Sequence, residues 1–150
     1  MAHTFTSLLA HVVFSTSGRA PFLADACRSD VHAYIGGILR ELKAIPIAIG
    51  GTEDHVHFLT RLPADLALAN CMRVVKANSS RWVKERWPER RAFAWQGGYG
   101  AFSVSESNRT AVIRYIQDQA RHHRRISFQD EFLVLLKRHG VDFDYRYMWQ

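Results

Sequence analysis

The stretch that decides the fold is IPIAIGGTEDHVHFLTRL, residues 45–62, in which two runs of alternating apolar residues flank a polar turn. In the first run isoleucine recurs at every second position, and the β pattern resumes at His55. Residues 50–54 between the runs contain two glycines and an aspartate, which tight turns favour. The stretch therefore predicts a β-hairpin that turns through residues 50–54.

The segments on either side of the hairpin alternate between strand and helix patterns. Residues 4–16 are apolar on both alternating faces, which predicts a central strand covered on both sides. Residues 24–43 carry apolar side chains at helical spacing, and so do residues 65–87, where Pro88 ends the pattern. Residues 93–104 are rich in aromatic residues and glycine and predict a further strand.

Two more helices are expected near the C-terminus, one over residues 105–123 and one from Ser127 to Gly140. The order β-α-β-β-α-β followed by two helices predicts an α+β fold, a ferredoxin-like sandwich. Its antiparallel sheet would have helices on one face, and the C-terminal helices would carry Tyr115. We expect one domain over residues 1–150, with an extended tail whose aromatic residues pack on the body or on a second subunit. These aromatic residues are Phe143, Tyr145, Tyr147 and Trp149.

Composition excludes several classes of protein. The chain has 150 residues, 47% of them hydrophobic and 23% charged, as is typical of a globular domain. No apolar run reaches the roughly 18 residues of a membrane span, and the first residues lack the pattern of a signal peptide. We therefore expect a cytoplasmic protein without a membrane partner. Cys27 and Cys71 have no CxxC spacing, which argues against a disulfide framework or a zinc ribbon.

Positive charge is concentrated in two segments of the chain. The net charge is +6, and residues 73–91 hold seven basic residues against two acidic ones. Residues 106–125 hold five against two. Such clustering is typical of a surface that binds nucleic acid, although two solvated helix faces would look similar. The residues expected to hold a DNA backbone are Arg73, Lys76, Lys84, Arg121, Arg124 and Arg125.

Two histidines follow the turn of the hairpin. His55 and His57 are two positions apart on the predicted strand, so their side chains project from the same face. Two imidazoles on a rigid strand can reach one divalent metal and leave positions open for a phosphate oxygen and a third ligand. The alternative is a pair of partly exposed strand histidines with no ligand.

A tyrosine and a glutamine share one face of the helix predicted over residues 105–123. Tyr115 and Gln119 are one helical turn apart. A tyrosine in such a place is commonly a core aromatic. The amide oxygen of Gln119 can also serve as a third metal ligand while the phenol faces the same phosphate. His122 and His123 lack a matching Cys or His pair, and we interpret them as polar residues near DNA.

Four segments carry a resemblance to a known family. They are HVHF after the Gly-Gly turn, KANSSRW at 76–82, WQGGYGAFSV at 95–104, and YIQDQ at 115–119 with the following histidine pair. Together they resemble the single-tyrosine HUH transposases of the insertion sequence 200/605 type over nearly the whole chain. The resemblance implies that His55 and His57 form the histidine–hydrophobic–histidine pair and that Tyr115 is the nucleophile. It also implies that Gln119 completes a site for Mg²⁺ or Mn²⁺.

The same resemblance implies an activity and partners. Members of the family cleave and rejoin single-stranded DNA through a covalent 5′-phosphotyrosine, recognise hairpin DNA at element ends, and work as homodimers. In several of them the tyrosine helix of one subunit completes the site of the other. Two other interpretations stay open: a ferredoxin-like nucleic-acid-binding module without catalysis, and a domesticated transposase acting on repetitive extragenic palindromes. A hydrolytic phosphoesterase with paired histidine motifs is disfavoured because the chain has a single such motif.

Overall fold

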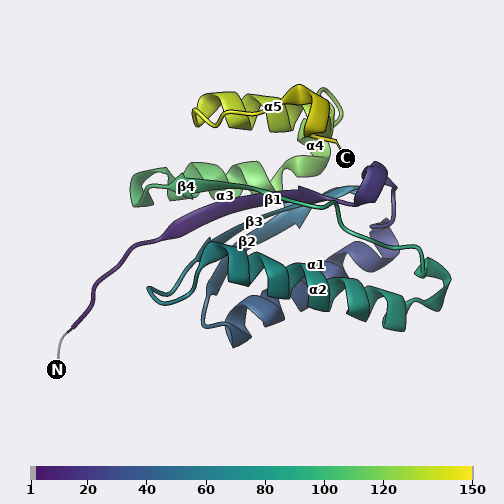
Figure 1. Cartoon of the computed structure of the whole chain (residues 1–150), viewed down its shortest axis with the longest axis horizontal. Helices are drawn as coiled ribbons and strands as arrows, with labels where there is room; N and C mark the ends of the chain where they lie inside the picture. The colour runs from purple at the N-terminus through teal and green to yellow at the C-terminus, as the bar shows by residue number, and fades with distance from the viewer. Residues whose placement is uncertain (1–2, 150) are drawn as a thin grey trace.

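A four-stranded antiparallel sheet forms the middle layer of the molecule (Figure 1). The computed structural model describes residues 3–149, without the side chain of Tyr147. The strands lie in the order β2-β3-β1-β4, as expected of a ferredoxin-like β-α-β-β-α-β unit. They are β1 (Leu9–Ser15), β2 (Ile45–Gly51), β3 (His55–Arg61) and β4 (Gly100–Val104).

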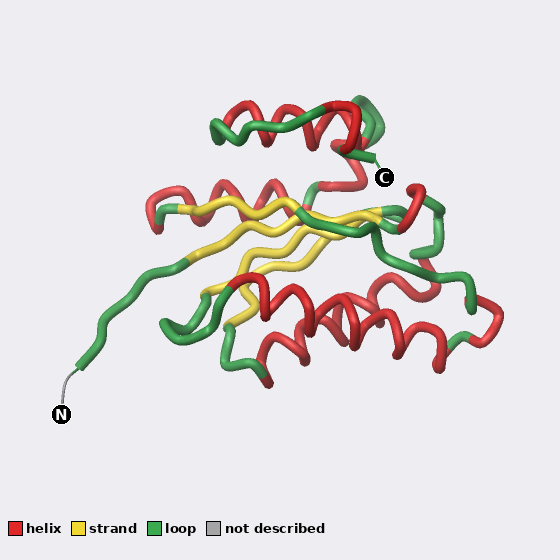
Figure 2. The backbone as a smooth tube through the Cα atoms, in the orientation of Figure 1, coloured by secondary structure: helices red, strands yellow, loops and turns green. Residues whose placement is uncertain are grey.

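Helices cover both faces of this sheet (Figure 2). The crossover helices α1 (Asp25–Glu41) and α2 (Leu68–Arg86) lie on one face. The C-terminal helices α3 (Arg109–Gln117), α4 (Gln119–His122) and α5 (Phe128–Arg138) lie on the other. The predicted α+β fold is confirmed, with the tyrosine-bearing helix on the face opposite the crossover helices. Among residues 3–149, no helix is both long and apolar enough to span a bilayer.

The alternation of side chains along the two central strands separates the core from the second face. β1 and β3 pair in antiparallel register, with Val12 opposite Phe58 and Val13 opposite His57. Val12 and Phe58 are fully buried and belong to the large core that α1 and α2 cover. Val13 and His57 therefore face the C-terminal helices. The hairpin predicted from residues 45–62 is confirmed, and it presents both histidines of β3 to this second face.

Two smaller apolar clusters hold the C-terminal helices on the second face. Ile116 of α3 is fully buried and packs with Leu9 and Leu59 of the sheet. The cluster under α5 consists of Val13, Phe102, Phe128, Phe132, Leu135 and Leu136. The N-terminus of α5 is capped as predicted, because the Ser127 hydroxyl accepts a hydrogen bond from the Asp130 amide at 3.2 Å. These contacts fix α3 over β2 and β3, and α5 over β1 and β4.

Several element boundaries differ from the predicted ones. β1 begins at Leu9 rather than at residue 4, since residues 3–8 are exposed and have no covering layer. β4 begins at Gly100 rather than at residue 93, because residues 93–99 form a loop that inserts Trp95 into the core. The indole nitrogen of Trp95 donates to the Ser79 hydroxyl of α2 at 2.9 Å.

The helix predicted over residues 105–123 is divided in two. Its first turn is a 3-10 helix, Glu106–Asn108, and α3 and α4 are separated at Asp118, whose φ of −100° and ψ of 19° lie outside the helical range. The bend leaves Tyr115 at the end of α3 and Gln119 at the start of α4. Both side chains nevertheless face the sheet.

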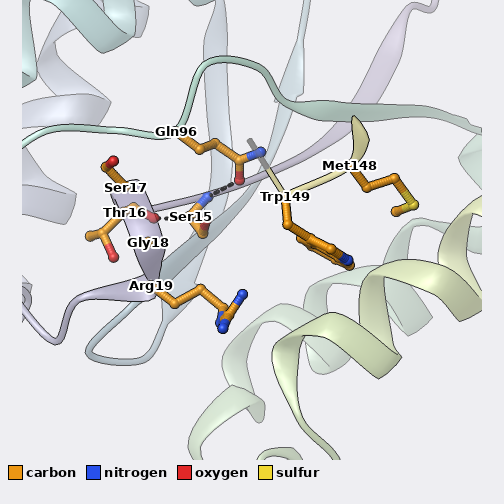
Figure 3. A pocket seen from close by; sticks show the side chains of 8 residues that line it. All are labelled: Ser15, Thr16, Ser17, Gly18, Arg19, Gln96, Met148 and Trp149. Carbon is orange, nitrogen blue, oxygen red and sulfur yellow. Dashed lines mark hydrogen bonds between the residues drawn. The ribbon is translucent and has the colours of Figure 1, made fainter. Parts of the chain in front are cut away.

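The C-terminal tail is not the extended segment that its alternating aromatics predicted. Tyr145–Tyr147 form a short 3-10 helix, and Trp149 turns back to pack against Phe128 and Phe132 of α5. The side chain of Tyr147 lies outside the described part of the chain. Trp149 and Met148 line one side of a cavity of about 40 Å³ at the end of β1, with Gln96 and Arg19 on the other side (Figure 3). This cavity has room for a water molecule.

The close approach of α3 to β2 predicts the effect of a single methyl group. A Cβ on Gly50 would lie 2.2 Å from the backbone oxygen of Ile116, so Gly50→Ala must displace α3 from the sheet. We expect a loss of about 1–3 kcal/mol of unfolding free energy in urea denaturation. Gly37→Ala in α1 is the matched control, because a Cβ there meets nothing within 4 Å. It should stabilise the chain by about 0.5–1 kcal/mol, and an equal loss in both variants would contradict this packing.

Candidate active site

β3 supplies two buried imidazoles whose orientation is fixed by their neighbours. The Nδ1 atom of His55 lies 2.7 Å from a carboxylate oxygen of Asp54 and 2.9 Å from the Thr52 hydroxyl. Because the carboxylate accepts hydrogen bonds, His55 carries its proton on Nδ1 and directs the lone pair of Nε2 inward. His57 Nδ1 is hydrogen-bonded to His11 Nε2 at 2.9 Å, which leaves His57 Nε2 facing the same space.

The segment around α4 adds an amide and a third imidazole. Gln119 is buried, and its Oε1 lies 3.0 Å from Nε2 of both His55 and His123. His123 donates from Nδ1 to the carbonyl of Ile126 at 2.7 Å, so its Nε2 faces inward. The sequence interpretation of His123 as a polar residue near DNA gave it no role among the ligand atoms, although its helical spacing from Gln119 predicts the same inward face. His122, beside it, remains at the rim with its ring 5.2 Å from that of Tyr115.

A buried carboxylate that sequence reasoning did not select lies at the centre of the group. Glu131 of α5 is 2% exposed, and its Oε1 is 2.9 Å from His57 Nε2 and 3.1 Å from His123 Nε2. A signal was present in the sequence. Glu131 follows Phe128 by three positions and precedes Leu135 by four, so it lies on the apolar stripe of α5. A charged side chain is rarely buried there unless it is paired or binds a ligand.

Tyr115 lies against this group in the same chain. Its hydroxyl donates a hydrogen bond to Oε2 of Glu131, and its ring is 5.7 Å from that of His57. The four residues selected from the sequence as nucleophile and metal ligands therefore lie together. They are His55, His57, Tyr115 and Gln119.

The spacing of the inward-facing atoms fits a metal ion. One ligand atom from each of His55, His57, His123 and Glu131 lies within 4.8 Å of all the others. Metal–ligand bonds of about 2.0–2.2 Å place neighbouring ligands about 3.0–3.5 Å apart. The contacts of Glu131 Oε1 with the three imidazoles, at 2.9, 3.1 and 3.6 Å, fall close to this range. Imidazole nitrogens and a carboxylate oxygen that converge at such distances can bind a cation.

Burial and the Glu131 carboxylate determine the protonation of the group. Burial lowers the pKa of His57 to about 4 and that of His11 to about 3. Burial and the negative charge of Glu131 raise the pKa of the Tyr115 phenol well above its usual value. Burial acts against ionisation of Glu131, but hydrogen bonds with His123 and His57 hold the pKa of its carboxyl below the ordinary range. The free site thus combines neutral His57, an anionic carboxylate and a protonated phenol.

Two cavities adjoin the group, and they share no lining residue. Tyr115 and His11 line a cavity of about 250 Å³, together with Arg138. Asp54 and His123 line another of about 220 Å³. The nucleophile and the imidazole cluster can therefore be approached from different directions.

The six basic residues expected to hold DNA are divided between the two faces of the sheet. Arg73 and Lys84 are exposed on α2, on the face away from Tyr115. Lys76 instead donates from Nζ to the carbonyls of Gln96 at 2.6 Å and Gly98 at 2.8 Å, so it supports the loop before β4. On the other face, α4 and the residues after it present three exposed arginines, Arg121, Arg124 and Arg125.

Comparisons with known proteins agree with this architecture. Residues 4–119 match a family model described as "Transposase IS200 like". No curated protein matches the chain. A crystal structure of a candidate transposase from Deinococcus radiodurans R1 is similar, with a TM-score of 0.67 and 20% identity over 79% of this chain and 95% of that one. A REP-associated tyrosine transposase bound to a REP hairpin has a TM-score of 0.58 and 14% identity, over 77% of this chain and 68% of that one.

The buried imidazoles predict how stability depends on pH. The pKa values of His57 and His11, about 4 and about 3, lie below the 6.5 of an unfolded histidine, so the unfolded chain binds more protons between these values. This contribution to stability is complete above pH 6.5 and is lost as the pH falls toward 4. His32, with a pKa lowered to about 4 by burial, acts in the same direction. His123, whose pKa is raised, acts in the opposite direction.

We therefore expect the unfolding free energy of the metal-free chain, measured in urea with chelator present, to decrease between about pH 7 and pH 5. The carboxyls change protonation mainly below this window, so the dependence of the unfolding free energy on pH within it comes from the histidines. An unfolding free energy that stays constant or rises as the pH falls through this window would contradict the buried, neutral imidazoles.

Proposed function

Because this chain belongs to the family of IS200-like transposases, we propose that it cleaves and rejoins single-stranded DNA through a covalent bond between Tyr115 and a 5′-phosphate. One observation carries the proposal. The hydroxyl of Tyr115 lies against a buried cluster of metal-ligating atoms within the same chain. A module that only binds DNA needs neither a phenol so placed nor buried lone pairs that converge on one point.

His55, His57 and Gln119 would hold Mg²⁺ or Mn²⁺ through Nε2, Nε2 and Oε1. Asp54 and Thr52 keep His55 in the tautomer that can bind a metal, and His11 orients His57. A divalent ion at this place would withdraw charge from a non-bridging oxygen of the scissile phosphate.

The chain's own contribution to the covalent step is the placement of the Tyr115 oxygen. This oxygen attacks phosphorus in line, the bond from phosphorus to the 3′-oxygen breaks, and the 5′-phosphate remains on the tyrosine. The phenol loses one proton and the released 3′-oxygen gains one. The phosphotyrosine diester conserves the energy of the broken bond, so a 3′-hydroxyl of another strand can reverse the step without ATP.

DNA is the partner of a transposase, and we propose that the recognised form is a hairpin with a single-stranded flank. A similar fold is seen in the REP-associated tyrosine transposase that is bound to a REP hairpin. Arg121, Arg124 and Arg125 are exposed next to the site and would contact the phosphates of the cleaved strand. Arg73 and Lys84 would contact a second part of the DNA from the α2 face.

Tyr115→Phe tests the nucleophile. With labelled hairpin DNA from the chain's own genomic flanks and Mg²⁺ or Mn²⁺, the unmodified chain should form a denaturant-resistant adduct. Tyr115→Phe should lower its rate of formation by at least about a thousandfold while hairpin binding persists, and chelator should abolish it. Tyr145→Phe is the matched control, because Tyr145 is 63% exposed and lies on the tail.

The possible results separate the functions. An adduct that survives in Tyr115→Phe would rule out this nucleophile. Tight hairpin binding with no adduct in either metal would favour the non-catalytic module. Release of free cleaved product with no covalent intermediate would favour a hydrolytic phosphoesterase.

We also propose that the tyrosine acts within its own chain in a homodimer. The contact between Tyr115 and Glu131, and the proximity to His57, need no second subunit. A mixture of Tyr115→Phe and His57→Ala chains should therefore form no adduct, after light scattering has shown a mass of twice 17.2 kDa and subunit exchange has been allowed. Restored adduct in the mixture would place the tyrosine in the partner's site, and a monomer mass would contradict the dimer.

A further inference from the structure

We propose that Glu131 is a further ligand of the metal and the residue that positions Tyr115, so that one carboxylate joins the metal site to the nucleophile. The inference rests on the proposed function and deepens it. Oε1 of Glu131 lies 2.9 Å from His57 Nε2, within the group of metal-ligating atoms. Oε2 accepts the hydrogen bond of the Tyr115 hydroxyl.

The hydrogen bonds around the site turn three imidazole nitrogens toward Oε1 of Glu131. His55 and His123 both carry a proton on Nδ1, where Asp54 and the Ile126 carbonyl accept it. Their Nε2 atoms therefore face Oε1 of Glu131 at 3.6 and 3.1 Å. In the metal-free chain, protons on Nε2 of His57 and His123 bridge the contacts with Oε1. A divalent ion can replace these protons, because the same nitrogen and oxygen atoms then direct their lone pairs at one point.

The orientation of Gln119 supports the same assignment. Its amide nitrogen donates to Oε2 of Glu131 at 3.1 Å, so its own oxygen must face the imidazoles. Oε2 then receives two hydrogen bonds, one from Gln119 and one from Tyr115. Oε1, which receives none from these two groups, remains directed at the metal-ligating atoms. One oxygen of Glu131 thus faces the metal-ligating atoms, and the other holds Tyr115 and Gln119 by hydrogen bonds.

Burial makes the carboxylate costly without a cation. The Glu131 side chain is 1% exposed, and in the part of the chain that the structure describes it forms ion pairs with histidines alone. A buried carboxylate is retained where it is paired or coordinates a metal. Phe128 and Phe132 hold α5 against the sheet on either side of Glu131, which keeps the carboxylate in place.

The assignment extends the active site beyond the segment that matches the family model. That match ends at residue 119, whereas Glu131 belongs to α5. α5 is then part of the catalytic apparatus and not only a cover for the sheet. The carboxylate also gives a physical reason why Tyr115 points at the metal site before DNA arrives.

Glu131→Gln tests the proposal, because it keeps the shape of the side chain and removes its charge. We expect its affinity for Mn²⁺, measured by calorimetry without DNA, to fall at least about tenfold, and the visible absorption of bound Co²⁺ to change. At saturating Mn²⁺, adduct formation with hairpin DNA should remain at least about tenfold slower, since a neutral amide holds Tyr115 less firmly than the carboxylate does. Asp130→Asn is the control: it removes a charge from the exposed neighbour on the same helix and should leave all three readouts unchanged.

Urea denaturation establishes that each variant is folded. If Glu131→Gln does not fold, Glu131→Asp takes its place, and the shortened carboxylate should weaken Mn²⁺ binding at least about threefold. Mn²⁺ affinity equal to that of the unmodified chain would overturn the assignment as a ligand. Tighter Mn²⁺ binding with faster adduct formation would also overturn it, because Glu131 would then obstruct the site.

His57→Ala separates this inference from the proposed function. If His57→Ala binds Mn²⁺ as well as the unmodified chain, or if the unmodified chain forms no adduct, the proposed function fails. If His57→Ala loses Mn²⁺ and the unmodified chain forms the adduct while Glu131→Gln behaves normally, the role of Glu131 alone is wrong.

Discussion

The two-residue repeat of a single strand, β3, is the constraint on which the rest of the structure depends. Val56 and Phe58 point to the core under α1 and α2, so His55 and His57 must point to the opposite face. A shift of one position would put both imidazoles in the apolar core. The register with β1 and the tight turn after β2 prevent that shift, and the large core therefore also determines the direction of the histidines.

The second face is organised around nitrogen and oxygen atoms that converge on one point. Hydrogen bonds to Asp54 and to the Ile126 carbonyl fix two imidazoles with their Nε2 atoms inward. Gln119 and Glu131 direct oxygens to the same place. The apolar contacts of α3 and α5 provide the binding energy that holds this arrangement together. Packing thus creates a preformed site for a cation, and the phenol of Tyr115 is its neighbour.

Periodicity along the chain was sufficient for the element order, the antiparallel sheet and the face on which His55 and His57 lie, because these follow from local patterns. Tyr115 and Gln119 were found from one helical turn, although the helix bends at Asp118 between them. His11, His123 and Glu131 were not selected as site residues. His11 meets His57 through the pairing of β1 with β3, whereas Glu131 meets the imidazoles because α5 folds back over the sheet. No spacing within one element encodes these contacts. The loop before β4 was predicted as strand because it is rich in aromatic residues. In the structure these residues enter the core from irregular backbone.

Anomalous diffraction at the manganese edge, from crystals grown with Mn²⁺, tests the central claim most directly. The account predicts one strong peak bonded to Nε2 of His55 and His57 and to Oε1 of Gln119, with the Tyr115 oxygen beside it. Fully occupied Mn²⁺ elsewhere on the chain, or an ordered cluster with no peak at saturating Mn²⁺, would contradict it.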